Sequence, residues 1–189
     1  MAIRIRPVEI LKDVTVEKTD ELFKVKGPLG SLQLKIHPSV NIKIENNKVI
    51  VTEKKPESMV YVGTARAHIR NMIIGVAQGY EKILEVRGTG YRAQKTKDGI
   101  QVQVGFIHPV DFHIPKEINC EIKQVPNPED PKIQITEIII KGVDKQLVGE
   151  LAAEIRSTKP PDVYQGKGIR YKGEYVRKKA GKRAVATQT

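Results

Sequence analysis

The sequence predicts an α+β protein made of two tandem, duplicated domains, each a small antiparallel β-sheet packed against one α-helix, plus a basic C-terminal arm. Three observations support this fold class. Blocks of the first half recur in order in the second half, each half passes from strand-like to helix-like periodicity, and positive charge gathers at the C-terminal end. The expected limits are residues 1–81 and 82–158 for the two domains and 159–189 for the arm.

The internal repeat rests on three ordered pairs of similar blocks. These pairs are Val62–Arg70 with Val148–Arg156, Lys48–Thr52 with Lys132–Thr136, and Leu32–Ile44 with Val110–Ile122. The distance between paired blocks is 78, then 84, then 86 residues along the chain, and an insertion at Val125–Pro131 accounts for the increase of six. The three prolines of this insertion predict a surface loop. The recurrence indicates duplication, with a domain boundary near Gly79–Lys82.

Strands are expected wherever apolar residues alternate with polar ones. Leu32, Leu34 and Ile36 alternate in this way, as in a half-buried strand. Asn46-Asn47 predicts a tight turn between two such segments in the first half. Asp98-Gly99 predicts a hairpin in the second half, because both residues tolerate the positive φ angles of a tight turn.

One helix is expected after the strands of each half. Apolar residues recur every three or four positions at Met59, Val62, Ala65, Ile69, Met72 and Val76, and again at Val148, Leu151, Ala152 and Ile155. Ser58 and Asp144 are the expected N-caps. Gly79 is expected at the C-terminal end of the first helix, and Pro160-Pro161 ends the second.

The letters of a dinucleotide-binding turn occur at Gly88–Ala93, directly after the strand-like Ile83–Val86. That turn needs a helix after it, because the pyrophosphate sits on the helix N-terminus. Ala93–Phe106 alternates around Asp98-Gly99 instead, so another strand is expected. The glycines are interpreted as a bend between two strands, and no cofactor is expected.

No other constellation predicts catalysis or metal binding. The four histidines are His37, His68, His108 and His113, and none has Cys or carboxylate partners at metal-ligand spacing. Cys120 lies between Ile118 and Ile122 at strand period, so it is expected to be a buried thiol. A single cysteine fits a reducing compartment. Neither a signal peptide nor an apolar run near the length of a membrane span is recognised, so a cytoplasmic protein is expected. Because no catalytic constellation is found either, the protein is expected to be non-enzymatic and to have no small-molecule substrate.

Charge points to a polyanionic partner. The formal net charge is +11 and the isoelectric point is about 9.7. Residues 159–189 hold nine cations and two carboxylates, and three of the six tyrosines lie among them. Cations neutralise phosphates and tyrosines stack on unpaired bases, so nucleic acid is the first expectation, ahead of an anionic membrane surface. The arm is expected to be ordered by its partner, and the alternative is a solvated tail.

Specific motifs narrow this expectation. Pro161–Tyr171, followed by Glu174–Arg177, closely resembles the C-terminal signature of the ribosomal large-subunit protein six family in its bacterial form. Val25–Gly30, Gly88–Ala93 and Lys141–Gly149 look like that family's first-domain hairpin, inter-domain strand entry and second helix start. The resemblance covers nearly the whole chain and includes the duplicated layout.

The resemblance implies a structural constituent of the large ribosomal subunit that binds its ribosomal RNA directly. Neighbouring large-subunit proteins are implied partners, and translational GTPases would dock nearby, at the stalk base and sarcin-ricin loop. Carried over by position, the resemblance implies RNA contacts at Tyr164, Lys167, Gly168, Arg170 and Tyr171. From their charge, the other cations of the arm are expected to contact phosphates as well: Lys159, Lys172, Arg177, Lys178, Lys179, Lys182 and Arg183.

The chain departs from the family pattern at two places. Gln165 stands where the family usually has Lys, so one phosphate contact is missing or replaced. Arg4–Pro7 replaces the usual N-terminal start. Two other functions stay open from the sequence: a free-standing RNA chaperone that uses the same arm, and a cofactor-dependent enzyme that uses Gly88–Gly90. A bacterial and an organellar ribosome also fit equally.

Overall fold

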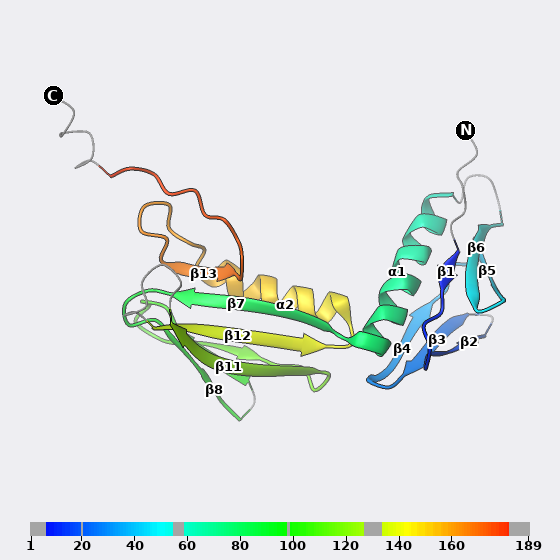
Figure 1. The fold of residues 1–189 in the computed structure, drawn as a ribbon, viewed down its shortest axis with the longest axis horizontal. Coiled ribbons are helices and arrows are strands. Elements are labelled where there is room, and N and C mark those ends of the chain that lie inside the picture. Colours follow the sequence, from blue (N-terminus) through cyan, green and yellow to red (C-terminus); the bar gives the residue numbers. More distant parts are fainter. Residues whose placement is uncertain (1–6, 20, 55–58, 98, 127–133, 182–189) are drawn as a thin grey trace. The chain divides into compact units, whose positions relative to one another are not determined.

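The computed structural model describes residues 7–19, 21–54, 59–97, 99–126 and 134–181. The chain divides into two compact units (Figure 1). Unit 1 contains Met1–Tyr80 and Gly142–Lys145, and unit 2 contains Glu81–Lys141 and Gln146–Thr189.

Unit 1 holds two small sheets and one helix. Its elements are β1 (Val8–Glu9), β2 (Thr15–Lys18), β3 (Leu22–Gly27), β4 (Gly30–Lys35), β5 (Val40–Glu45), β6 (Lys48–Glu53) and α1 (Met59–Gln78). The strand orders are β1-β6-β5 and β2-β3-β4, with antiparallel neighbours. Asn46 and Asn47 join β5 to β6 with φ angles of 46° and 62°, which confirms the predicted tight turn.

The core of unit 1 lies between these strands and α1. Phe23 and Val25 from β3 and Val49 from β6 are fully buried, and α1 covers them with Ile69 and Val76 among other residues. The predicted apolar stripe is buried only in the C-terminal half of α1, where the helix meets the strands. At its beginning the prediction is wrong for Met59, which is 41% exposed, and the predicted cap Ser58 lies outside the described residues.

The end of α1 agrees with the prediction. Gly79 has a φ of 77°, and its N–H donates a hydrogen bond to the carbonyl of Gly75. A glycine adopts this left-handed conformation without the steric cost that a Cβ would add.

Unit 2 repeats this plan with one more strand. Its elements are β7 (Tyr80–Arg87), β8 (Arg92–Lys95), β9 (Gly99–Gln103), β10 (Val110–His113), β11 (Ile118–Pro126), β12 (Gln134–Gly142), α2 (Lys145–Thr158) and β13 (Gly168–Tyr171). The strand orders are β10-β9-β8 and β11-β12-β7-β13.

The sheet orders confirm the duplicated α+β fold. β1-β6-β5 corresponds to β7-β12-β11, and β2-β3-β4 corresponds to β8-β9-β10, with a helix after the sixth strand in each case. Each unit has two small sheets, where a single one was expected. In β12 all residues from Ile135 to Ile140 are buried, so this strand is covered on both faces and one helix alone does not provide that cover. β13 is the addition that distinguishes unit 2 among the described elements.

Several local predictions in unit 2 are confirmed. Strand β8 follows the glycines at Gly88–Gly90, so the helix required by a dinucleotide-binding turn is not formed there. β8 and β9 pair as the predicted hairpin, with Asp98 itself outside the described residues. α2 begins directly after Asp144 and ends at Thr158, before the prolines. Cys120 is 2% exposed.

One local prediction is wrong in part. The insertion at Val125–Pro131 was expected to be a loop throughout, but β11 extends through Val125 and Pro126. The remainder of the insertion lies outside the described residues, as does Arg4–Arg6. Neither described helix is long and apolar enough to cross a membrane.

Candidate nucleic-acid interface

The basic segment, residues 159–181, contains one strand of unit 2, β13, which follows a loop at residues 159–167. β13 pairs antiparallel with β7, from Gly168 opposite Arg87 to Tyr171 opposite Leu84. Ile169 is fully buried. The expectation that this arm is ordered only by a partner is therefore wrong for Gly168–Tyr171. Without β13, β7 would be the edge of its sheet, and an edge strand readily accepts another strand because its backbone groups need partners.

The loop that leads into β13 is held by its own hydrogen bonds. The Asp162 carboxylate accepts the N–H groups of Tyr164 at 3.2 Å and Gln165 at 2.9 Å. The Asp162 N–H donates to the carbonyl of Lys167 at 2.8 Å. This carboxylate satisfies turn amides, so one of the two acidic residues in the segment serves the fold.

Gly168 has a structural reason to be glycine. Its φ is +145°, and a Cβ placed there would lie 2.6 Å from the carbonyl oxygen of Pro160 and 2.7 Å from the Cα of Pro161. The lack of a Cβ at this position therefore lets the chain pack closely against its own prolines.

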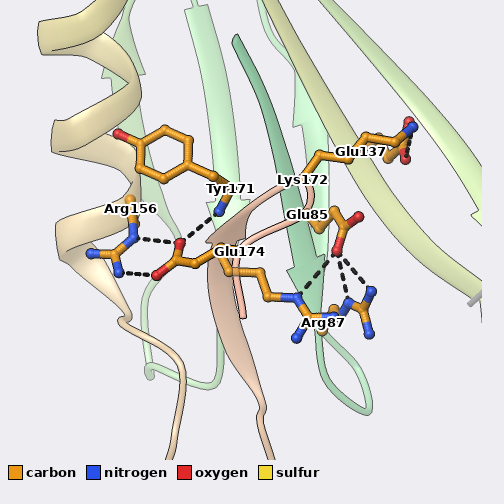
Figure 2. Close-up of polar contacts among 8 residues, drawn as sticks. Glu85, Arg87, Glu137, Arg156, Tyr171, Lys172 and Glu174 are labelled. Atoms are coloured by element: carbon orange, nitrogen blue, oxygen red, sulfur yellow. Dashed lines mark hydrogen bonds and ion pairs between the residues drawn. The ribbon is translucent and has the colours of Figure 1, made fainter. Parts of the chain in front are cut away.

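A buried carboxylate ties β13 to β7 through two guanidinium groups. Glu85 on β7 is 4% exposed. It accepts hydrogen bonds from Arg87 Nε at 2.9 Å and from Arg170 Nε at 3.2 Å, and Arg87 Nη2 lies 2.8 Å away (Figure 2). The Arg87 and Arg170 side chains are only 11% and 10% exposed. The Arg170 side chain is thus buried against the neighbouring strand β7, and its guanidinium group pairs with Glu85.

A second ion pair holds the chain beyond β13. The Glu174 carboxylate forms a bidentate ion pair with Arg156 of α2, in which Arg156 Nε donates a hydrogen bond at 3.0 Å and Arg156 Nη2 contacts the other carboxylate oxygen (Figure 2). The same carboxylate accepts a hydrogen bond from the Tyr171 N–H at 3.0 Å. The hydrogen bond from Arg156 lowers the pKa of Glu174, and the same bond raises the pKa of Arg156. Both acidic residues of the basic segment are therefore engaged within the fold.

Beyond Tyr171, the segment contacts β12 and its own preceding loop. Lys172 Nζ lies 2.9 Å from the buried Glu137 carboxylate on β12, and this hydrogen bond raises the pKa of Lys172. The N–H of Lys179 donates to the carbonyl of Val163 at 2.8 Å. An open groove of about 710 Å³ lies along this path, with Tyr175 and Val176 in its lining.

The predicted site residues fall into four classes. Tyr164, Lys167, Lys172, Arg177, Lys178 and Lys179 are exposed, Lys159 and Tyr171 are half-buried, Gly168 and Arg170 are buried, and Lys182 and Arg183 lie outside the described residues. The Tyr171 ring already has two cations near it, because Lys82 Nζ and the Arg156 guanidinium each lie 5.7 Å from its centroid. Tyr164, at 58% exposure, is the more open aromatic ring.

Sequence reasoning missed the residues that hold the segment in place. Glu85, Arg87 and Arg156 lie outside the segment, and no spacing connects them to it before the fold is known. One signal was available, because carboxylates as rare as Asp162 and Glu174 in so basic a segment favour internal salt bridges or caps.

The described residues thus form a protein of the two-domain α+β class, with a duplicated fold and a basic segment held on its second unit. The family model described as "Ribosomal protein L6" matches residues 11–79 and again residues 87–172, once in each repeat. The chain belongs to this family of ribosomal proteins, and the predicted absence of enzymatic activity agrees with the family.

Individual relatives match nearly end to end. The chain is 44% identical over 180 residues to "Large ribosomal subunit protein uL6" of Listeria monocytogenes serotype 4a, covering 94% of this chain and 95% of the relative. It is 43% identical over 188 residues to uL6 of Thermotoga maritima, covering 95% and 97%. It is 44% identical over 178 residues to "Large ribosomal subunit protein uL6c" of Guillardia theta, covering 93% and 94%.

Proposed function

We propose that this chain is a structural constituent of the large ribosomal subunit that binds large-subunit ribosomal RNA directly through its basic segment. The observation that carries the proposal is that strand pairing and ion pairs hold this segment on unit 2. Its two carboxylates are used inside the fold, while Lys167, Arg177 and Lys179 stay exposed. A surface of cations held in place binds phosphates with less loss of conformational entropy than a free tail does.

Some residues of the segment are proposed to contact RNA, and others to hold the segment in place. The cations proposed to contact phosphates are Lys159, Lys167, Arg177, Lys178 and Lys179, continued by Lys182 and Arg183, whereas Lys172 is already paired with Glu137. Tyr164 is proposed to stack on a base or to bond the RNA backbone. Tyr171, Gly168 and Arg170 are proposed to act from within, by holding β13 and the loop before it. Gln165, exposed beside Tyr164, offers a neutral amide where the family pattern has a cation.

We further propose a location, which family membership and the resemblance of the segment support. We place the protein on a cytoplasmic ribosome near the stalk base and the sarcin-ricin loop, with other large-subunit proteins as neighbours and translational GTPases docking nearby. The support is the second match to the family model, which ends at Lys172 and so includes β13.

Cosedimentation tests the proposal. A tagged copy should stay with large subunits through a gradient run after a high-salt wash. Recovery at the top of the gradient would instead indicate a free-standing RNA-binding factor and would refute the ribosomal assignment. Chemical footprinting of large-subunit RNA with and without the protein tests the location, because protections away from the stalk base and sarcin-ricin loop would contradict it.

A further inference from the structure

The loop between β9 and β10 carries two adjacent large apolar side chains at the surface. Ile107 is 95% exposed and Phe106 is 44% exposed. One exposed apolar residue is ordinary on a protein surface. Two neighbours at a loop tip, of which one is almost fully solvated, indicate an interaction site.

This loop is supported from below by Tyr91. A Cβ on Gly105, which has a φ of +79°, would lie 3.2 Å from Tyr91 Cε1, and a Cβ on Gly88 would lie 2.5 Å from Tyr91 Cδ2. The Tyr91 N–H also donates to the carbonyl of Gly88 at 3.2 Å. The ring therefore lies against both glycines. Ile107 is therefore exposed on a loop that Tyr91 holds in place, and such preorganisation of the loop favours binding.

The loop lies at the start of the basic segment. Lys159 Nζ is 5.2 Å from the centroid of the Phe106 ring. Lys159 is itself held, because its carbonyl accepts the N–H of Ile169 on β13 at 2.8 Å. A cation and an apolar tip are thus adjacent, and residues 104–109 contain no acidic residue.

We infer that Phe106 and Ile107 form an apolar contact of the RNA-binding surface, with Ile107 placed against an unpaired base or a sugar face and Lys159 beside a phosphate. The inference rests on the proposed function and adds a contact that the basic segment does not contain. RNA fits this surface better than a protein does, because folded RNA offers flat base faces directly next to phosphates. Apolar side chains that insert between bases are an established mode of nucleic-acid binding.

The test compares three variants in binding to deproteinised large-subunit ribosomal RNA over a range of salt concentrations. Ile107→Ser should bind roughly tenfold more weakly, the loss expected from removing a buried aliphatic side chain. Its salt dependence should match the wild type, since no charge is lost. Ile107→Leu should keep its affinity within about twofold, because it conserves volume. Val60→Ser, at a side chain 76% exposed on α1, is the matched control and should bind as the wild type does.

The outcomes separate this inference from the proposed function. If the wild type binds RNA with a steep salt dependence and Ile107→Ser binds equally well, the inference is overturned and the proposed function stands. If Ile107→Ser keeps RNA affinity but is lost from large subunits during a high-salt wash, the loop contacts a protein and the RNA contact is refuted. If the wild type itself shows no salt-dependent binding, the proposed function fails. An equal loss in Val60→Ser would also overturn the assignment to this loop.

Discussion

Replacement of Arg170 tests whether this cation supports the fold or contacts RNA. The sequence placed it among the phosphate ligands, whereas the structure pairs it with the buried Glu85. Arg170→Met keeps much of the side-chain length and removes the charge. Glu85 retains Arg87 as a partner after this change, with contacts at 2.9 and 2.8 Å. The cost should therefore be that of one hydrogen bond to a charged group, about 1.5–3 kcal/mol.

Replacement of the shared carboxylate should cost more. Glu85→Gln would leave two guanidinium groups, 11% and 10% exposed, without their common counter-charge. Removing one partner of a buried ion pair typically costs about 3–5 kcal/mol. Lys167→Met removes an exposed cation and should leave the free energy of unfolding unchanged. The expected order of destabilisation is Glu85→Gln, then Arg170→Met, then Lys167→Met.

Urea unfolding and RNA binding together give the answer. With a urea m-value of about 2 kcal/mol/M, Arg170→Met should lower the unfolding midpoint by roughly 1 M. Its salt dependence of RNA binding should match the wild type under native conditions, whereas Lys167→Met should lose about 0.9 of the slope on double-helical RNA. A normal midpoint for Arg170→Met combined with a loss of slope would refute the structural role and restore Arg170 as a phosphate contact.

Three further predictions concern single groups. Because the pKa of Glu174 is lowered in the folded protein, its ion pair stabilises the fold above the unfolded pKa of about 4, and this stabilisation is lost as the pH falls through the lower, folded pKa. Glu174→Gln should therefore be less stable than the wild type at pH 7 and approach wild-type stability below about pH 4. Urea titrations measure this difference, with Glu154→Gln on the exposed side of α2 as the control. An equal gap at all pH values would contradict this. Gly168→Ala should cost about 2 kcal/mol in thermal unfolding because a Cβ has no room there, whereas Gly181→Ala should be neutral, and equal melting temperatures would refute the packing argument. Burial raises the pKa of the Cys120 thiol to about 11, so iodoacetamide at pH 8 should alkylate it slowly until urea unfolds the protein, and rapid native labelling would show the thiol to be accessible.

Much of the fold is encoded in local patterns. Asn46-Asn47 defined a turn, Gly79 defined a helix end, and the two prolines defined the end of α2, because each residue acts on its own stretch of backbone. Matching blocks also predicted two copies of one fold. The second sheet in each unit was not predictable in this way, because strand periodicity shows that a strand has a buried face and not which strands share a sheet.

The candidate site was predictable in composition and less so in geometry. Clustered charge identified the basic segment, but the strand β13 within it was not predicted. What the segment pairs with depends on β7, about 85 residues earlier, and on Glu85 within it. Long-range pairing of this kind leaves no signal in spacing. Arg170 therefore resembled every other cation of the segment until the sheet order was known.

The central claim is that exposed cations of a segment fastened to unit 2 bind large-subunit RNA. Deleting the chain from Lys159 would remove β13 along with the charges, so charge neutralisation is the cleaner experiment. The decisive measurement is the salt dependence of RNA binding by a variant with Lys167, Arg177 and Lys179 all changed to Gln. At about 0.9 per phosphate contact, the slope should fall by roughly 2.7 while the urea midpoint stays at the wild-type value. An unchanged slope with an intact fold would contradict the claim and leave the segment as a solvated edge of the second unit.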